Sequence, residues 1–195
     1  MEATTSLRER KKEATRRALH DAAMKLALER GLENVTLDAV ADAANVSRRT
    51  FSNYFANKED ALLYGDQQRV TRLLEAIRAR PARESAWKAL VNGAADRFAD
   101  ATEIDPHFEV QLRLVRRHPS LLARQLGLQA GLERDIADEI AKRLPDRDEV
   151  QARIMAAVFL ATVRAVLHGW VESGGPAPIR DVVADGLARA GAAFK

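Results

Sequence analysis

Two adjacent arginines begin a short polar segment whose side chains are suited to hydrogen bonding with DNA bases. The segment reads Ser47-Arg48-Arg49-Thr50, and Asn53 follows one helical turn later. Arginine matches O6 and N7 of guanine, asparagine matches N6 and N7 of adenine, and a threonine methyl group can touch the thymine methyl. The spacing therefore makes four residues candidate base readers: Arg48, Arg49, Thr50 and Asn53.

Groups suited to phosphate surround this segment. The hydroxyls of Thr36, Ser47 and Tyr54 can donate to phosphate oxygens. Lys58 stands at an expected helix start, where free backbone amides also attract anions. Such contacts would position the protein on DNA without specifying a sequence. A basic stretch farther upstream could reach the DNA backbone or the minor groove, and it contains Arg8, Arg10, Lys11, Lys12, Arg16 and Arg17.

Helices must hold these side chains, because apolar residues near them recur at three- and four-residue spacing. A first stripe runs from Ala14 to Ala27, and Gly31 follows as a left-handed cap. Thr36 is the expected N-cap of a short helix, Asn45 lies in a tight turn, and Ser47 caps a second short helix. Two short helices joined in this way indicate a helix-turn-helix, whose later helix can enter the major groove.

The rest of the chain also reads as helix. Asn57 and Asp60 suggest a capping box that opens one long helix reaching Ile77. Apolar stripes predict further helices over residues 87–98, 106–117, 121–144, 147–171 and 179–194. We therefore expect an all-α fold of about nine helices. The segment 147–171 is apolar nearly all round, which implies burial on more than one side.

Composition and charge narrow the function. The 195 residues are 47% hydrophobic and 30% charged, the balance of a soluble globular protein. Residues 1–58 carry 11 Lys+Arg against 8 Asp+Glu, whereas residues 59–195 carry 20 of each, so the whole net charge of +3 lies in the N-terminal third. From spacing and charge alone, a DNA-reading helix and a solvated surface helix are equally favoured.

Several functional classes lack their signals. With no cysteine and four scattered histidines, the chain shows no metal-ligand spacing. It also has no glycine-rich phosphate loop and no nucleophile elbow, so we expect neither an enzyme nor a bound cofactor. The longest apolar run, Ile154–Val163, is far short of a membrane span. The charged N-terminus does not fit a signal peptide, and we expect a cytoplasmic protein without a membrane partner.

Three runs of sequence resemble the N-terminal signature of the TetR family of transcription regulators. They are Gly31 to Ala41 (GLENVTLDAVA), Ala44 to Phe51 (ANVSRRTF) and Tyr54 to Leu62 (YFANKEDAL). The resemblance implies a three-helix DNA-binding domain over residues 1–60 and a helical ligand-binding and dimerisation domain over 61–195. It places Thr36, Tyr54 and Lys58 on phosphate-contacting positions and Arg48, Arg49, Thr50 and Asn53 on the recognition helix. Ser52 departs from the pattern, because the family usually has an aromatic residue there.

The resemblance also implies a homodimer packed through the last two helices and a ligand pocket inside the C-terminal bundle. Apolar residues at helical spacing more often form an ordinary core than line a pocket. Arg113 shares a helix face with Arg116 and Arg117 that could hold an anion or simply be solvated. The segment His118 to Glu133 is similar to relatives associated with acyl-CoA-like ligands. The candidate ligand-binding residues are Trp87, Phe98, Phe108, Arg113 and Phe159.

These observations predict a repressor that binds a pseudo-palindromic double-stranded operator and is released by a small-molecule effector. A DNA-binding regulator that needs no small molecule is the first alternative, since the sequence does not separate a filled core from a pocket. A helical protein-interaction module is the second.

Overall fold

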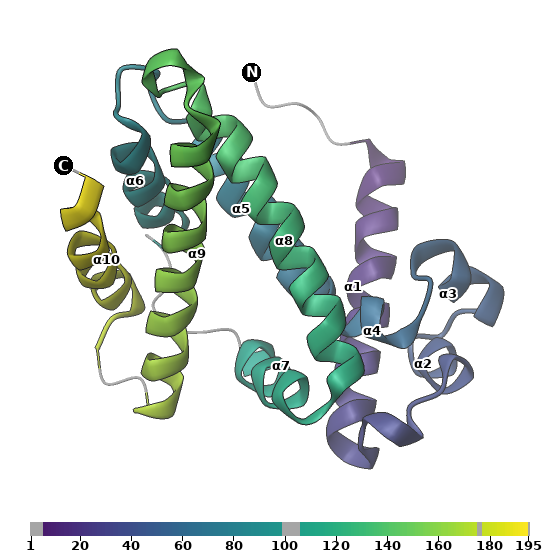
Figure 1. The fold of residues 1–195 in the computed structure, drawn as a ribbon. Helices are drawn as coiled ribbons and strands as arrows, with labels where there is room; N and C mark the ends of the chain where they lie inside the picture. The colour runs from purple at the N-terminus through teal and green to yellow at the C-terminus, as the bar shows by residue number, and fades with distance from the viewer. Residues whose placement is uncertain (1–5, 99–105, 175–176, 195) are drawn as a thin grey trace. The chain divides into compact units, whose positions relative to one another are not determined.

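The computed structural model describes residues 6–98, 106–174 and 177–194, and within these ranges it contains α-helices and short 3₁₀ segments but no strand. The all-α prediction is confirmed. The chain divides into two compact units. The first unit comprises residues 1–67 and 106–126, and the second comprises residues 68–105 and 127–195. Figure 1 labels the helices of both units.

The first unit contains α1 (Leu7–Arg30), α2 (Leu37–Ala43), α3 (Arg48–Tyr54), α4 (Lys58–Leu62) and α7 (Pro106–Arg117). Side-chain caps begin its short helices. Thr36 accepts from the amide of Ala39 at 3.2 Å, and Ser47 accepts from that of Thr50 at 3.0 Å. Asn57 accepts from the amide of Asp60 at 2.8 Å. The caps expected at Thr36, Ser47 and Asn57 are therefore confirmed.

Two positive φ angles shape the connections of the first unit. Asn45, in the turn between α2 and α3, has φ of 55°, and the next amide, that of Val46, bonds the carbonyl of Ala41 at 2.9 Å. Gly31 has φ of 78°, a value that glycine adopts without the cost a Cβ would add. Its ψ of 150° lies outside the left-handed helical region, so the expected left-handed cap is wrong in form although the need for glycine is right.

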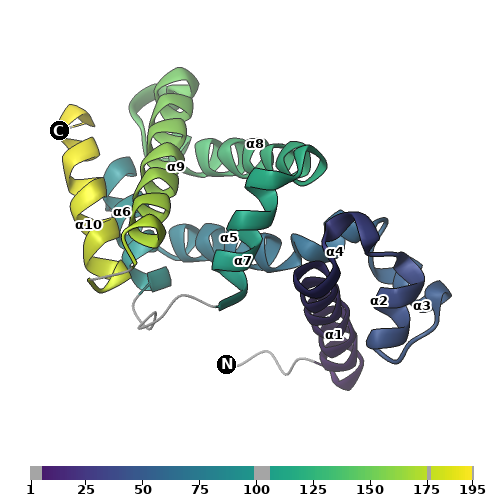
Figure 2. The same ribbon diagram turned by 90° about the horizontal axis from the view of Figure 1, so that it is seen from below.

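The two helices of the helix-turn-helix dock on α1. Leu19, Ala23 and Met24 of α1 are fully buried, as are Val40 of α2 and Phe51 of α3. Figure 2 shows α2 and α3 lying beside α1. Burial of these apolar side chains supplies most of the stability of this unit, because helices as short as α2 and α3 are marginal alone.

The long helix expected from Asn57 to Ile77 is interrupted at Leu63, giving α4 and α5 (Tyr64–Arg78). Leu63 has φ of −87° and ψ of 4°, yet its amide still bonds the carbonyl of Glu59 at 2.9 Å. This break accounts for ten α-helices where about nine were expected in the parts the structure describes. The expected capping box is wrong in its second half, since the Asp60 carboxylate bonds Arg124.

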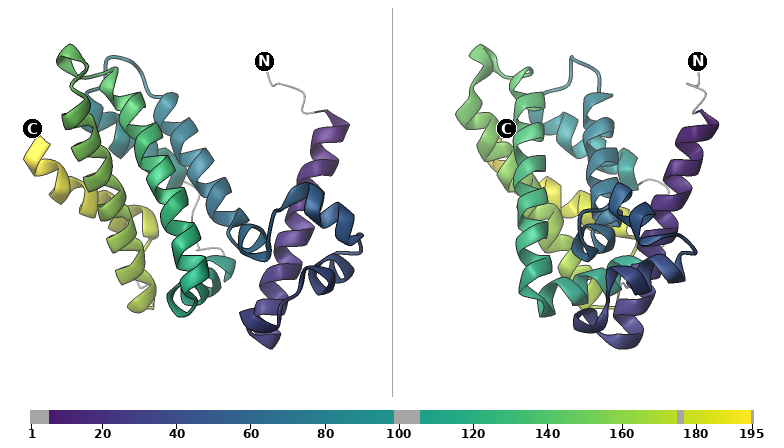
Figure 3. Two further views of the ribbon diagram at one scale, coloured as in Figure 1. Left: turned by 45° about the vertical axis from the view of Figure 1, so that its right-hand side comes forward. Right: turned by 90° about the vertical axis from the view of Figure 1, so that its right-hand side faces the viewer.

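The second unit contains most of α5, α6 (Ala86–Phe98), the later part of α8 (Pro119–Ala141), α9 (Glu149–Glu172) and α10 (Ile179–Ala190). Helix α10 packs against both α9 and α6, as Figures 1 and 3 show. The core of this unit is a continuous apolar cluster with fully buried Ile77, Leu90, Ile136, Ile140 and Phe159.

Helix α9 buries only one side within the chain. Ala152, Met155, Ala156, Phe159 and Val163 face the core, whereas Val150 is 69% and Ile154 is 47% exposed. Within the single chain α9 is therefore buried on one side, and burial of a second side stays a prediction that depends on a partner chain. By length and composition alone α9 could cross a membrane, a test that core helices of soluble proteins also pass.

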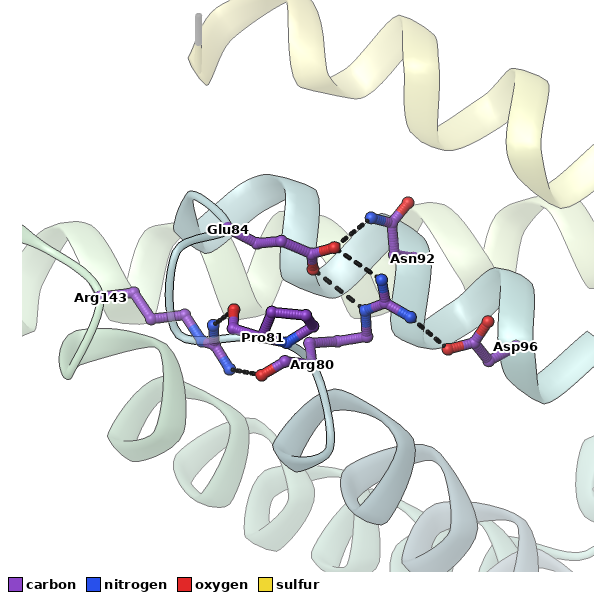
Figure 4. A network of polar contacts seen from close by, with 6 residues as sticks. All are labelled: Arg80, Pro81, Glu84, Asn92, Asp96 and Arg143. Carbon is purple, nitrogen blue, oxygen red and sulfur yellow. Dashed lines mark hydrogen bonds and ion pairs between the residues drawn. The ribbon is translucent and has the colours of Figure 1, made fainter.

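A polar network joins the end of α5 to α6 and α8 (Figure 4). Arg80 forms a two-pronged contact with Glu84, at 2.6 and 3.0 Å, and bonds Asp96 at 2.7 Å. Asn92 also donates to Glu84, at 2.9 Å. Arg143 donates to the backbone carbonyls of Arg80 and Pro81. The loop between α5 and α6 is thus held by charge-assisted hydrogen bonds.

The stability that this network contributes depends on pH through the Glu84 carboxylate. Hydrogen bonding from Arg80 is the main cause that lowers the pKa of Glu84 from 4.5 to about 2. A carboxyl with a lowered pKa stabilises the fold above pH 4.5, and this contribution is lost as the pH falls toward 2. We expect Glu84→Gln to lower the melting temperature at pH 7 and the difference from the wild type to shrink toward pH 2. Thermal melts followed by circular dichroism at a series of pH values measure this difference.

The matched control is Asp138→Asn, which neutralises an exposed carboxylate of the second unit. Its difference from the wild type should be small throughout. A Glu84→Gln difference of equal size at pH 7 and pH 3 would contradict the role assigned to Glu84.

Candidate nucleic-acid interface

The candidate base readers all lie on α3 but differ in their freedom. Arg49 and Asn53 are exposed. Arg49 has neither a hydrogen-bond nor an ion-pair partner within the described ranges. Arg48 bonds Asp38 of α2 at 3.0 Å, which uses one of its five N–H donors. The hydroxyls of Ser47 and Thr50 lie 2.9 Å apart and share a hydrogen bond. Ser52, which departs from the TetR pattern, is also exposed.

A groove of about 780 Å³ joins α3 to the start of α1. From α3 it is lined by Thr50, Asn53 and Tyr54. From α1 it is lined by Leu7, Arg8, Glu9, Lys11, Lys12 and Thr15. The structure thus brings three members of the upstream basic stretch next to the recognition helix. Neighbouring cationic and hydrogen-bonding side chains form a surface suited to a nucleic-acid backbone.

Tyr54 is fixed by the same stretch. The guanidinium of Arg16 lies 5.8 Å from the centre of the Tyr54 ring, a cation–π contact between α1 and α3. This contact orients the tyrosine at the edge of the groove.

Lys58 has a structural task that its position in the sequence did not indicate. Its Nζ donates to the carbonyl of Leu32 at 2.8 Å and to that of Val35 at 3.0 Å. These bonds tie the start of α4 to the segment preceding α2. An ammonium group has three donors, so one proton remains for a phosphate.

A chain of aromatic and polar contacts connects α3 to α1. The rings of Phe51 and Phe55 lie 5.9 Å apart, and those of Phe55 and Tyr64 lie 5.5 Å apart. Tyr64 donates its hydroxyl to Glu13 of α1 at 2.6 Å. Burial, and then the hydrogen bond with Glu13, raise the pKa of Tyr64 to about 12. The phenol therefore stays protonated at neutral pH and keeps this link intact.

Side chains at the start of α8, and His118 just before it, contact acidic residues between Glu33 and Asp66. Arg124 bonds Asp60 at 2.6 Å, and the Asp60 side chain is only 9% exposed. Gln125 donates to Asp66 at 2.8 Å. Nearby, Ser120 donates to Glu59, and His118 lies 3.0 Å from Glu33. Sequence patterns did not indicate these contacts.

The candidate ligand residues are divided between the two units. Phe159 is fully buried in the core of the second unit, and Trp87 stacks on Phe194 at 4.8 Å. Phe98 is partly buried in that unit. In the first unit, Phe108 is half-buried and Arg113 is exposed. Among the residues the structure describes, no group of three or more histidines, aspartates and glutamates is placed to hold a metal ion.

Two family profiles match most of the chain. The profile of bacterial regulatory proteins of the tetR family matches residues 19–64, and that of the MftR C-terminal domain matches residues 84–195. The chain belongs to the TetR family. It is a DNA-binding transcriptional regulator and not an enzyme. TetR-family regulators bind operator DNA, dimerise, take up small molecules and are in general cytoplasmic.

Two relatives of this TetR-family regulator are transcriptional regulators. The HTH-type transcriptional regulator TcmR of Streptomyces glaucescens is 33% identical over 173 residues, which are 84% of this chain and 76% of TcmR. The mycofactocin biosynthesis regulator MftR of Mycobacterium tuberculosis is 29% identical over 168 residues, 84% of this chain and 83% of MftR.

Solved structures share the fold. SmeT, the repressor of the Stenotrophomonas maltophilia multidrug efflux pump SmeDEF, has a TM-score of 0.62 at 21% identity, over 93% of this chain and 91% of SmeT. FadR of Thermus thermophilus, in complex with lauroyl-CoA, has a TM-score of 0.53 at 23% identity, over 90% of this chain and 92% of FadR.

The structural role of Lys58 in this TetR-family regulator, its bonds to two backbone carbonyls, can be tested. Lys58→Met leaves two carbonyls without their charged donor, and we expect a loss of about 1–3 kcal/mol in the free energy of unfolding. Urea denaturation measures it. Lys25→Met is the control, because Lys25 is exposed on α1 and lies 3.9 Å from Glu29. It should change stability by less than about 0.5 kcal/mol. Equal stability of the two variants would contradict the structural role of Lys58.

Proposed function

We propose that this regulator is a repressor that binds a pseudo-palindromic operator as a homodimer and leaves it when a small-molecule effector binds. The observation that supports operator binding best is the groove between α1 and α3. It combines basic side chains of α1 with the polar face of the recognition helix. We assign residues 1–60 to DNA binding and residues 61–195 to the effector and the dimer.

Within this proposal the readers and the phosphate-binding residues have distinct tasks. Arg49 and Asn53 are exposed and read base edges directly. Arg48 keeps four donors beyond the one bonded to Asp38, and Thr50 offers its methyl group. The hydroxyl of Thr36, whose oxygen accepts from Ala39, can still donate to phosphate. Ser47, Tyr54 and Lys58 complete the phosphate contacts.

The dimer is proposed to form through α9 and α10. Helix α9 exposes Val150 and Ile154 on the side that does not face its own core. Apolar residues left in water on a long helix favour association with a second copy, because burial removes their surface from solvent. A two-fold dimer presents two recognition helices, which explains the expected symmetry of the operator.

Effector binding is proposed to act through helices that belong to both units. Helix α8 begins in the first unit, where Arg124 holds the buried carboxylate of Asp60 in α4, and continues into the second. A ligand that prefers another arrangement of α8 would shift the population of DNA-competent molecules by its differential affinity alone.

The effector class is proposed from relatives and from the residues of the bundle. One solved structure is a complex of SmeT with triclosan, and the FadR structure holds lauroyl-CoA. We infer an effector with a large apolar part, with an acyl-CoA-like molecule as the leading candidate. Phe98 is the proposed contact in the second unit, whereas Phe108 and Arg113 belong to the first unit. Phe159 would have to leave its core position to contribute, and Trp87 would have to leave its stack with Phe194.

A regulator without an effector is the second candidate. It is favoured by the burial of Phe159, which has no exposed surface, and by the stacking of Trp87 on Phe194. A thermal-shift screen in which no compound raises the melting temperature of the protein would support it.

Operator recognition is tested with a footprint on the promoter of the regulator's own gene and with anisotropy titrations of the protected fragment. We expect two-fold symmetric protection. Arg49→Ala should cost about 1–3 kcal/mol of base discrimination at the contacted pair, whereas Lys58→Met should weaken all sequences alike and reduce the salt slope by about 1. Lys25→Met serves again as control, since Lys25 lies ten residues beyond Thr15 of the groove, about 15 Å along α1. Asymmetric protection, or unchanged binding in both test variants, would refute the assignment.

The Arg124 contact is tested without an effector. Arg124→Met leaves the buried Asp60 carboxylate unpaired, and we expect faster hydrogen exchange in α4 and about tenfold weaker operator binding. Arg117→Met removes the same charge from an exposed position of the first unit and should leave both unchanged. Normal exchange and affinity in Arg124→Met would show that this ion pair does not position the DNA-binding helices.

A further inference from the structure

Arg48, the first residue of the recognition helix α3, is held by an acid from the helix before it. Its Nη1 donates to Oδ2 of Asp38 in α2 at 3.0 Å. A cation at the first position of a helix lies at the positive end of the helix dipole, so α3 itself does not favour an arginine there. The Asp38 carboxylate supplies the opposite charge that α3 lacks in its first turn.

The backbone that carries each partner is anchored by packing. Asp38 stands two residues before Val40, which is fully buried in the first unit. Arg48 stands three residues before Phe51, which is also fully buried. Because α2 and α3 pack against each other, the acid is presented to the arginine from a fixed position.

This ion pair has little to contribute to stability. The side chains of Arg48 and Asp38 are 64% and 58% exposed, and ion pairs in water are weak. Its consequence lies in the arrangement of the arginine. A long side chain that is restricted before DNA arrives loses less freedom when it binds. Arg49, the next residue, is exposed and has no such partner within the described ranges.

The contact leaves free the edge of the guanidinium that suits guanine. The bond to Asp38 engages Nη1 of Arg48, so Nε and Nη2 remain available. In Arg80 the same two nitrogens make the two-pronged contact with Glu84, at 3.0 and 2.6 Å. Two parallel N–H groups of this kind match O6 and N7 of guanine in the major groove.

We propose that Asp38 is a positioning residue for operator recognition, which holds Arg48 so that its Nε and Nη2 edge meets a guanine. This inference rests on the proposed binding of α3 to base edges and adds a specificity-determining residue that lies outside α3. Asp38 acts through Arg48 and touches no base itself. As an anion it is repelled by the phosphates, so its loss lowers specificity without lowering the affinity for unrelated DNA.

The experiment uses the full chain and the fragment protected in the footprint on the promoter of the regulator's own gene. Copies of this fragment carry each base pair of the two half-sites substituted in turn. Anisotropy titrations give the discrimination at each pair, which is the ratio of the affinities for the original and the substituted fragment. Arg48→Ala identifies the pair that Arg48 reads, where we expect the discrimination to fall about tenfold or more.

Asp38→Ala should lower the discrimination at the same base pair about three- to tenfold, a coupling typical of side chains in contact. Its affinity for unrelated DNA should be equal to that of the wild type or higher. In the double variant Asp38→Ala, Arg48→Ala the discrimination should equal that of Arg48→Ala alone, because Asp38 acts only through Arg48. Asp38→Glu, which keeps a carboxylate, should restore part of the discrimination.

The matched control is Asp42→Ala. Asp42 is an exposed acid one turn farther along α2, so this variant removes the same charge from the same helix. It should change no base preference. Asp38 also lies in the first turn of α2, where an acid is favourable to the helix. A role confined to that helix would lower the melting temperature and leave the discrimination unchanged, so thermal melts of each variant accompany the titrations.

Four results would overturn the inference. They are no pair at which Arg48→Ala loses discrimination, unchanged discrimination in Asp38→Ala, an equal loss in Asp42→Ala, and a further loss in the double variant, which would mean that Asp38 contacts a base directly. A wild type that binds its two-fold symmetric fragment while giving one of these results refutes only the positioning role. A wild type that binds no such fragment refutes the proposed function itself.

Discussion

Burial of Phe51 and Phe55 is the constraint on which the DNA-binding surface depends. Helices α2 and α3 have seven residues each, too few to persist in water, so their existence and their angle come from packing on α1. Phe51 is wholly buried, and the ring contacts continue through Phe55 to Tyr64 and from there to Glu13. Arg49 and Asn53, which do not take part in this packing, can then stay exposed on α3.

Local features of this fold were predictable from sequence, and distant ones were not. The caps at Thr36, Ser47 and Asn57 join residues three apart, so the sequence carries both partners in one short window. The bond between Asp60 and Arg124 joins residues 64 apart, and neither residue alone indicates the other. The local sequence shows Asn57 three residues before Asp60, a spacing that predicts a capping box, but it does not show the distant Arg124. The break at Leu63 lies two residues before Gly65, but a single glycine inside a helical pattern does not by itself mark a break.

The sequence also left the roles of several candidate site residues undecided. An apolar residue at helical spacing has the same pattern whether it fills a core or lines a pocket. The structure places Phe159 in the core and packs the partly buried Trp87 against it. Arg97, at the end of α6, has the sequence pattern of a solvated arginine. In the structure Arg97 is half-buried, and this burial lowers its pKa. Lys58 was predicted for phosphate, yet its bonds to two carbonyls required the folded chain.

The membership of α8 in both units bears on how such regulators can be recombined. Residues 106–126 pack with the N-terminal helices although they lie far along the chain. A hybrid made by joining residues 1–60 to a foreign C-terminal domain would keep Asp60 and lose Arg124, leaving the Asp60 carboxylate without its partner. The same restriction applies to the exchange of the second unit during evolution. The start of α8 must then stay with the N-terminal helices, or its residues must change to match them.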